Sequence, residues 1–340
     1  MRSACCGCRA RRERASPRSA SLLARCARPQ LICMIGFFAG NRPLDLRGSI
    51  CALATPFTQA GALDLDAFAR LLDYQLDGGT QALVVAGSTG EAHMLEHDEF
   101  DRLLAFAVKH VAGRVPVIAG TGEAGTAKTV ELTRRAAHLG ADAALVVTPY
   151  YVRPTQEGLR RHFVEVADHG GLPVIMYNVP SRTGCDLLPE TVALLRDHPG
   201  IVGLKEARND TVRIEALAEL ARADFVYLSG DDGTAARAML AGAAGTISVV
   251  ANLVPRAFRE LCDAAAAGDR DALQRAHEAL EPLVDALNGA PNPIAVKAGL
   301  PLLALGTAMP RLPLVELEEG AVRKQIHQAL ARLVPLSVVA

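Results

Sequence analysis

Eight short apolar runs recur along the chain, and segments with helical periodicity separate them at a spacing of about 28 residues per unit. The runs are rich in β-branched residues and almost continuously apolar, which is typical of parallel strands covered on both faces. They lie at residues 50–54, 82–86, 115–119, 143–147, 174–177, 201–204, 225–228 and 245–249. Eight strands that alternate with helices predict an α/β fold, a (β/α)8 TIM barrel, in preference to a doubly wound open sheet.

After residue 249 the alternation stops, and the rest of the sequence has a helical pattern. Glycine, proline and asparagine separate four helical segments, at 254–267, 269–288, 292–305 and 316–333. We expect the first segment to close the barrel and the other three to form a C-terminal three-helix appendix. The expected organisation is an N-terminal extension (1–45), a barrel that carries the active site (46–268) and a C-terminal helical region (269–340).

The first 33 residues differ in composition from the rest of the chain, with eight arginines, five of the eight cysteines and a single acidic residue, Glu13. No second Cys/His pair follows the cysteine cluster at zinc spacing, so a metal site is disfavoured. The favoured interpretation is a disordered or over-extended start, with the working protein beginning near Met34. A transit peptide or another function stays open. We expect a chain that starts at Met34 to keep full activity.

Composition excludes several classes of partner. The 340 residues carry a formal net charge of −1, which argues against nucleic acid or an anionic membrane as the main partner. No apolar run in the N-terminal segment reaches the roughly 20 residues of a membrane span. The other cysteines, Cys51, Cys185 and Cys262, are scattered, which suits a reducing environment. We therefore expect a cytoplasmic globular protein.

The carboxyl ends of the predicted strands carry many reactive side chains. In a (β/α)8 barrel these ends meet at one face, where active sites lie. Lys205 ends the sixth strand, Tyr177 ends the fifth, and Arg182 follows on the next loop. The other strand ends supply Ser88, Thr89, Tyr150, Tyr151, Asp231, Asp232 and Ser248. The mouth of the barrel is therefore the predicted site.

Lys205 is the residue on which the predicted chemistry depends. Burial lowers the pKa of a lysine and makes its amine a nucleophile for carbonyl groups, whereas the alternative is that Lys205 merely extends into solvent. Tyr177 lies one unit earlier, and its phenol can carry the protons that carbinolamine formation and dehydration require. Ser88, Thr89 and Arg182 offer two carboxylate sites beside this pair. The arrangement predicts condensation of an α-keto acid with an aldehyde that carries an acid group.

Three other motifs have simpler explanations. Residues 120–125 match the dinucleotide fingerprint, but the next strand lacks the acidic residue that it requires, so a tight barrel turn is favoured. His93 and His97 form a zinc-type H-x-x-E-H motif without a convincing third ligand, so loop histidines are favoured and no metal site is expected. Asp231 and Asp232 precede a predicted helix and are interpreted as an N-cap rather than a cation site.

Several motifs at these strand ends together resemble the dihydrodipicolinate synthase family of pyruvate-dependent class I aldolases. They are GSTGE at 87–91, TPYY at 148–151, YNVPSRTGCD at 177–186, GLKEA at 203–207, LSGDD at 228–232 and NPIAVK at 292–297. The resemblance covers about residues 46–335, and the N-terminal segment lies outside it. The same superfamily includes the N-acetylneuraminate lyases.

The resemblance implies a Schiff-base mechanism. Lys205 would form an imine with pyruvate, and Tyr177 would be the acid/base group, linked to Ser88 and Tyr151 in a proton relay. Tyr151 would come from the neighbouring subunit of a dimer, and two such dimers would form a homotetramer. No cofactor would be needed beyond the pyruvate held covalently on Lys205.

The resemblance also implies the substrates. Thr89 and the backbone at Ile247 would contact pyruvate, and Arg182 would bind the carboxylate of L-aspartate 4-semialdehyde. The product would be 4-hydroxy-tetrahydrodipicolinate, which belongs to the diaminopimelate and lysine pathway. One alternative is another pyruvate aldolase, acting on neuraminate, a 2-keto-3-deoxy sugar acid or hydroxy-oxoglutarate. A non-catalytic barrel that binds keto acids is a further alternative.

Two departures from the family pattern bear on these expectations. Ser88 replaces the usual threonine, as in the neuraminate lyases, which keeps the hydroxyl but loosens the substrate assignment. At the family's lysine feedback pocket, His97 and Tyr150 fit the pattern. Four positions that are polar or acidic in lysine-sensitive members instead carry Ala92, Phe100, Ala124 and Lys128. The ammonium of Lys128 would repel the ammonium of the effector, so we expect a vestigial pocket.

Overall fold

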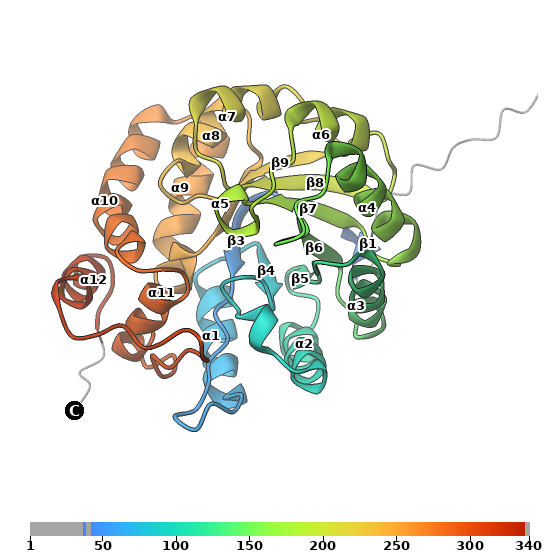
Figure 1. The fold of residues 1–340 in the computed structure, drawn as a ribbon. Coiled ribbons are helices and arrows are strands. Elements are labelled where there is room, and N and C mark those ends of the chain that lie inside the picture. Colours follow the sequence, from blue (N-terminus) through green and yellow to red (C-terminus); the bar gives the residue numbers. More distant parts are fainter. Residues whose placement is uncertain (1–36, 39–41, 337–340) are drawn as a thin grey trace, which may run out of the picture. The chain divides into compact units, whose positions relative to one another are not determined.

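The computed structural model describes residues 37–38 and 42–336, and these contain the predicted closed barrel of parallel strands (Figure 1). The barrel strands are β3 (Gly48–Ala52), β4 (Ala82–Val85), β5 (Val117–Gly120), β6 (Ala143–Val147), β7 (Val174–Asn178), β8 (Ile201–Glu206), β9 (Val226–Ser229) and β10 (Gly245–Ser248). Each strand pairs with the next, and β10 pairs with β3 to close the barrel. Earlier in the chain, β1 (Phe37–Phe38) and β2 (Arg42–Pro43) form a short antiparallel pair. The (β/α)8 prediction is confirmed.

Helices alternate with the barrel strands, as the sequence predicts. They are α1 (Leu65–Asp77), α2 (His97–Val111), α3 (Thr126–His138), α4 (Gln156–His169), α6 (Pro189–Leu195), α7 (Thr211–Ala218), α8 (Ala235–Ala241) and α9 (Pro255–Ala267). Side chains of Asp64, Thr155 and Asp210 accept hydrogen bonds from backbone N–H groups in the first turns of α1, α4 and α7. Over the described residues, every helix is too short or too polar to cross a bilayer.

Side chains of the barrel strands alternate between the barrel interior and the helix layer. Tyr177 belongs to the interior cluster, whereas its neighbour Met176 packs in the helix layer. Strands β7 and β8 align Tyr177 with Lys205 and Asn178 with Glu206. The alternation therefore directs Tyr177 and Lys205 into the mouth of the barrel, and it directs the next residue of each strand outward.

Helices α10 (Arg270–Asn288), α11 (Ile294–Gly299) and α12 (Ala321–Ala331) form the predicted appendix on one flank of the barrel (Figure 1). Two of the predicted helical segments are shorter than expected. Segment 292–305 is divided because Pro301 begins a separate 3₁₀ turn, η3 (Pro301–Leu303). Segment 316–333 becomes helical only at Ala321, directly after its N-cap Gly320.

Three short elements lie among the loops that follow the barrel strands: η1 (Ala92–Met94), α5 (Pro180–Thr183) and η2 (Val250–Asn252). The sequence pattern does not predict these elements, because three or four residues are too few to show a helical period. Helix α5 matters most for the site, since it carries Arg182. The predictions made for residues 1–33 lie outside the described residues.

Candidate active site

A cavity of about 270 Å³ lies at the carboxyl ends of the barrel strands. Its lining includes five of the predicted site residues: Ser88, Thr89, Tyr177, Arg182 and Lys205. A wider hollow of about 810 Å³ at the opposite ends of the strands contains none of these residues. The predicted chemistry therefore converges on the smaller cavity, which lies where (β/α)8 enzymes place their active sites.

Lys205 and Tyr177 are in contact within this cavity. The Nζ atom of Lys205 lies 4.4 Å from the centroid of the Tyr177 ring, and the lysine is only 5% exposed. Burial lowers the pKa of Lys205 to about 8, the Asp232 carboxylate opposes this shift, and Arg182 adds to it. A useful share of the amine is therefore neutral near physiological pH and able to attack a carbonyl.

Tyr177 is positioned for proton transfer. Burial raises the pKa of its phenol, while Arg182 and a hydrogen bond with Ser88 oppose that shift. The phenol thus stays protonated at neutral pH and can donate a proton to a reacting group beside Lys205. The contact with Ser88 is the first link of the predicted relay.

Lys297 on α11 is a second buried lysine, but it has a different partner. Its ammonium forms an ion pair with the Glu91 carboxylate, and both side chains are fully buried. Burial lowers the pKa of Lys297 to about 8, whereas Glu91 raises it. Lys297 does not line the cavity, and its charge is neutralised by Glu91. Lys205 is therefore the candidate nucleophile.

The ion pair of Lys297 holds the loop that carries Ser88 and Thr89. Glu91 ends this loop in a left-handed conformation, with φ of 55°. Its Oε2 atom accepts a hydrogen bond from the backbone N–H of Arg311 at 2.8 Å. Lys297 lies in the 292–297 motif but is not among the predicted site residues, although a lysine within an apolar helical segment is a signal for a buried charge.

Asn292 links the two candidate carboxylate sites. Its Nδ2 atom donates to Oγ1 of Thr89 at 3.0 Å, and its backbone oxygen accepts from Nη2 of Arg182 at 2.9 Å. The C-terminal region thus connects residues that lie on different sides of the cavity. Asn292 is likewise not among the predicted site residues.

Two predicted residues do not join this group within the chain. Tyr151 is 90% exposed and has a φ of 72°, and it is absent from the cavity lining. Ile247 is fully buried in the barrel interior and does not line the cavity, although Val249 and Val250 do. A single chain therefore assembles the lysine, the phenol, the first relay hydroxyl and the arginine.

The acidic pair at 231–232 does not cap α8 as expected. Asp231 accepts hydrogen bonds from the backbone and hydroxyl of Thr234, which is itself the N-cap residue. Asp232 accepts from the backbone N–H groups of Val249 and Val250, at 2.9 Å each. Its carboxylate therefore holds the turn after β10, and the N-cap interpretation was wrong.

The glycines of 120–125 have a packing role. A Cβ at Gly120 would lie 2.1 Å from the oxygen of Ala86, and one at Gly122 would lie 2.4 Å from the nitrogen of Val147. Glycine is needed because neighbouring strand ends approach closely, which agrees with the tight barrel turn. His93, from the zinc-type motif, packs edge-on against Tyr150 with 4.7 Å between ring centroids.

The residues of the predicted effector pocket lie on η1, α2, α3 and the loops after β5 and β6. Tyr150 donates a hydrogen bond to Oε2 of Glu123 at 2.8 Å, and Glu123 is not one of the predicted pocket residues. Burial and Glu123 together raise the pKa of Tyr150 to about 12. Lys128 is exposed on α3, and His97 is the first residue of α2.

Chemistry in which a barrel lysine condenses with a keto acid belongs to the Schiff-base lyases, and the fold and this cavity define that class. A comparison with known families gives the particular member. The model of the dihydrodipicolinate synthetase family matches residues 45–333, and the chain belongs to this family.

Individual relatives agree with that assignment. The 4-hydroxy-tetrahydrodipicolinate synthase of Xanthomonas axonopodis pv. citri is 60% identical over 81% of this chain and 90% of its own. The chloride-inhibited dihydrodipicolinate synthase of Acinetobacter baumannii, solved with pyruvate, superposes with a TM-score of 0.83 at 40% identity, covering 85% of this chain and 99% of its own. A monomeric variant of dihydrodipicolinate synthase gives a TM-score of 0.82 at 40% identity, covering 85% and 97%.

Proposed function

We propose that Lys205 is the amine through which this chain condenses pyruvate with L-aspartate 4-semialdehyde. The chain is a lyase that forms 4-hydroxy-tetrahydrodipicolinate in the diaminopimelate and lysine pathway, with pyruvate bound covalently to a lysine and no additional cofactor. The observation that carries the assignment of Lys205 is its contact with Tyr177 in a cavity that also contains Arg182.

The chemistry follows from the positions of these side chains. The neutral amine of Lys205 attacks the keto carbon of pyruvate, and loss of water gives the imine. Tyr177 supplies and removes the protons of these steps, with Ser88 as its hydrogen-bonded relay partner. Loss of a methyl proton gives the enamine, which attacks the aldehyde carbon of the second substrate. The amino group of that substrate then displaces Lys205 and releases the product.

We propose that two carboxylate-binding sites position the two substrates relative to one another. Thr89 and the backbone at Ile247 are proposed to hold pyruvate, and Arg182 is proposed to hold the carboxylate of the semialdehyde. The guanidinium of Arg182 suits a carboxylate because its planar donors match two oxygens. Asn292 connects Thr89 with Arg182, so the two sites are fixed relative to one another.

The assembly that we propose is a homotetramer made of two dimers. Tyr151 would enter the partner's relay, and its 90% exposure in a left-handed conformation is otherwise hard to explain for a tyrosine. Leu194, Val212 and Leu240 form a second set of exposed apolar side chains, on α6, α7 and α8. Sedimentation velocity of the intact chain tests this proposal, because a monomer would leave Tyr151 without a site.

We further propose a cytoplasmic location, which the three buried free thiols of Cys51, Cys185 and Cys262 support. The boundaries at 45 and 268 stay predictions, as does the dispensability of the residues before Met34.

The lowered pKa of Lys205 predicts how imine formation depends on pH. The neutral amine is the nucleophile, and a pKa of about 8 leaves about a tenth of it neutral at pH 7. The rate constant for imine formation with pyruvate is expected to rise about tenfold between pH 6 and pH 7 and to level off near pH 9. Borohydride quenching at timed intervals measures this constant, and a rate independent of pH would contradict the prediction.

The residues at the predicted effector pocket predict weak inhibition of the enzyme by L-lysine. At 1 mM L-lysine the initial rate is expected to stay above about four fifths of its uninhibited value, because Lys128 repels the effector. Lys128→Glu, which restores an acidic side chain at this position, is the matched variant and is expected to be more sensitive. Half-inhibition of the unaltered chain below 1 mM in the same assay would disprove the prediction.

The substrate assignment is tested by comparing two reactions. The chain is expected to consume pyruvate with L-aspartate 4-semialdehyde, and to release pyruvate far more slowly from neuraminate, 2-keto-3-deoxy sugar acids or hydroxy-oxoglutarate. The reverse preference would favour another pyruvate aldolase. A pyruvate adduct on Lys205 after borohydride reduction, seen by peptide mass, separates a lyase from a barrel that only binds keto acids.

A further inference from the structure

We propose that Asn178 and Glu206 form a clamp that positions the Lys205 amine against the Tyr177 phenol, an inference that rests on the proposed function. Each clamp residue directly follows one of these two residues, Asn178 on β7 and Glu206 on β8. Asn178 is 0% exposed and Glu206 1% exposed, and neither lines the cavity. The clamp residues act through the strands and are positioning residues.

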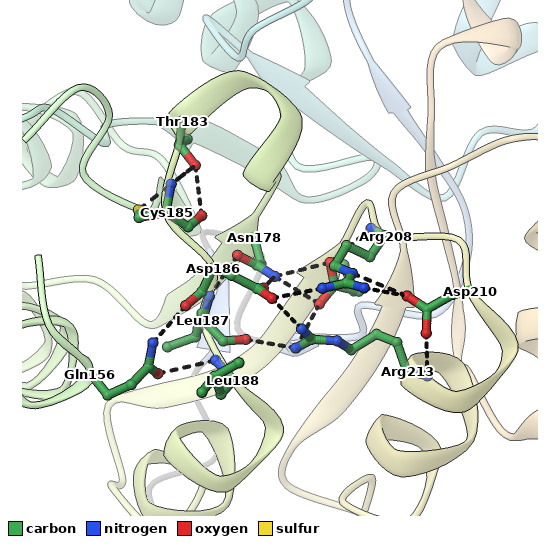
Figure 2. Close-up of polar contacts among 11 residues, drawn as sticks. Gln156, Asn178, Thr183, Cys185, Asp186, Leu187, Leu188, Arg208, Asp210 and Arg213 are labelled. Carbon is green, nitrogen blue, oxygen red and sulfur yellow. Dashed lines mark hydrogen bonds and ion pairs between the residues drawn. The ribbon is translucent and has the colours of Figure 1, made fainter. Parts of the chain in front are cut away.

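Both polar atoms of the Asn178 amide form hydrogen bonds (Figure 2). Its Nδ2 atom donates to the two carboxylate oxygens of Glu206, at 3.1 and 2.9 Å, and to Oδ1 of Asp186 at 2.8 Å. Its Oδ1 atom accepts from the backbone N–H of Leu187 at 2.9 Å. A side-chain amide has two donor hydrogens and one acceptor oxygen, so each of them is used. The orientation of Asn178 is therefore fixed.

Glu206 connects the clamp with the side chain of Lys205. Its backbone oxygen accepts from the N–H of Gly230 at 2.7 Å. Gly230 packs on Lys205 so closely that a Cβ there would lie 2.9 Å from Cε of the lysine. Oε1 of Glu206 also accepts from the backbone N–H of Arg208 at 2.8 Å. Glu206 thus holds both the end of β8 and the residue that packs on the lysine chain.

The charges beside the clamp are balanced from the helix layer. The guanidinium of Arg213 on α7 lies 2.5 Å from Oδ2 of Asp186 and 3.8 Å from Oε2 of Glu206, and its side chain is 6% exposed. Arg208 also pairs with Asp186, at 2.9 Å, and Figure 2 shows both arginines converging on that carboxylate. An amide at 178 donates to both acids, whereas a carboxylate there would repel them. The residue type at 178 therefore suits this position in particular.

The clamp also reaches the third site residue. The contacts of Asn178 with 186–187 hold the segment that follows α5, the turn that carries Arg182. One buried amide thus ties together the strand ends of Tyr177 and Lys205 and the loop of Arg182. Precise placement matters because a shift of about 1 Å between reacting groups costs up to about a hundredfold in rate.

Two isosteric variants test the clamp. Asn178→Asp removes the donors, and Glu206→Gln replaces one acceptor oxygen by a second amide. Each is expected to lower kcat and the rate of borohydride trapping of pyruvate on Lys205 by at least about twentyfold, since both report the placement of the amine. The KM for pyruvate is expected to change less than about threefold, because Thr89, the proposed pyruvate contact, is not altered. Glu206→Gln is the milder change and decides the question if Asn178→Asp fails to fold.

Thr80→Val is the matched control for a merely structural effect. It removes a buried hydrogen bond from Thr80 Oγ1 to Gln75 Oε1, of 2.8 Å, at the other end of the barrel. Its melting temperature is expected to fall about as far as that of Glu206→Gln, while kcat stays within about twofold. Equal losses of kcat in the two variants would overturn the clamp.

The exchange variant Asn178→Asp with Glu206→Gln provides the rescue test. In this double variant the amide at 206 can donate a hydrogen bond to the carboxylate at 178. The variant is expected to trap pyruvate at least about fivefold faster than Asn178→Asp alone. No gain over Asn178→Asp would count against the clamp. If the unaltered chain itself forms no adduct on Lys205, the proposed function fails. Normal trapping in that chain and in both single variants overturns only the clamp.

Discussion

Replacing Lys205 by alanine is expected to lower kcat by at least about a thousandfold, because the reaction loses its nucleophile and not only a binding contact. The cavity around residue 205 offers no substitute amine, since Lys297 is held in an ion pair with Glu91. The proposed binding residues Thr89 and Arg182 would remain in place, so KM is expected to change much less than kcat.

The measurement combines turnover with covalent trapping. A coupled assay with both substrates gives kcat, and peptide mass after borohydride reduction shows whether residue 205 carries pyruvate. Lys109→Ala, which removes an exposed lysine of α2, is the matched control and is expected to keep both activity and adduct. Turnover of Lys205→Ala within tenfold of the unaltered chain would refute the imine mechanism at this residue.

Replacing Lys297 by methionine is expected to reduce the free energy of unfolding by about 3–5 kcal/mol, because Glu91 would keep a buried charge without its partner. Both side chains are fully buried. The Phe57 ring contacts two cations, with Lys297 Nζ and Arg311 Cζ each 4.2 Å from its centroid. Methionine would preserve the volume and the contact with the ring while removing the charge.

Thermal unfolding measures this loss, and the melting temperature is expected to fall by at least about 6 °C. Lys324→Met, on the exposed side of α12, is the matched control and is expected to change it by less than about 1 °C. Adding Glu91→Gln to Lys297→Met is expected to recover most of the loss, since both charges are then absent. A single variant as stable as the unaltered chain would show that the pair is not needed.

The positions of Lys205 and Tyr177 could be predicted because they depend on a local rule. Each residue ends an apolar run, and one strand–helix unit separates them, so parallel pairing brings them together. The structure aligns them as neighbours on β7 and β8. The cavity residues that escaped prediction depend on packing instead. Asn292 meets Thr89 from 203 positions away, and no periodic pattern encodes such a contact.

The predicted ends of two helices were wrong because single residues ended or delayed a helix that the apolar spacing predicts. The apolar spacing of 292–305 and 316–333 is helical, but Pro301 divides the first segment and the second becomes helical only after Gly320. Tyr151 shows a different limit. Its predicted role depends on a neighbouring subunit, and the sequence of one chain contains no direct signal for the surface that receives it.

The pairing of Glu91 with Lys297 has a consequence for the order in which the protein is made. Glu91 leaves the ribosome 206 residues before Lys297. The loop that ends in Glu91 therefore lacks its ion-pair partner while those residues are synthesised. Strands with neighbours already present can pair as they emerge. The loop gains its counter-ion only when α11 has been synthesised, so the segment that carries Ser88 and Thr89 is fixed late in translation.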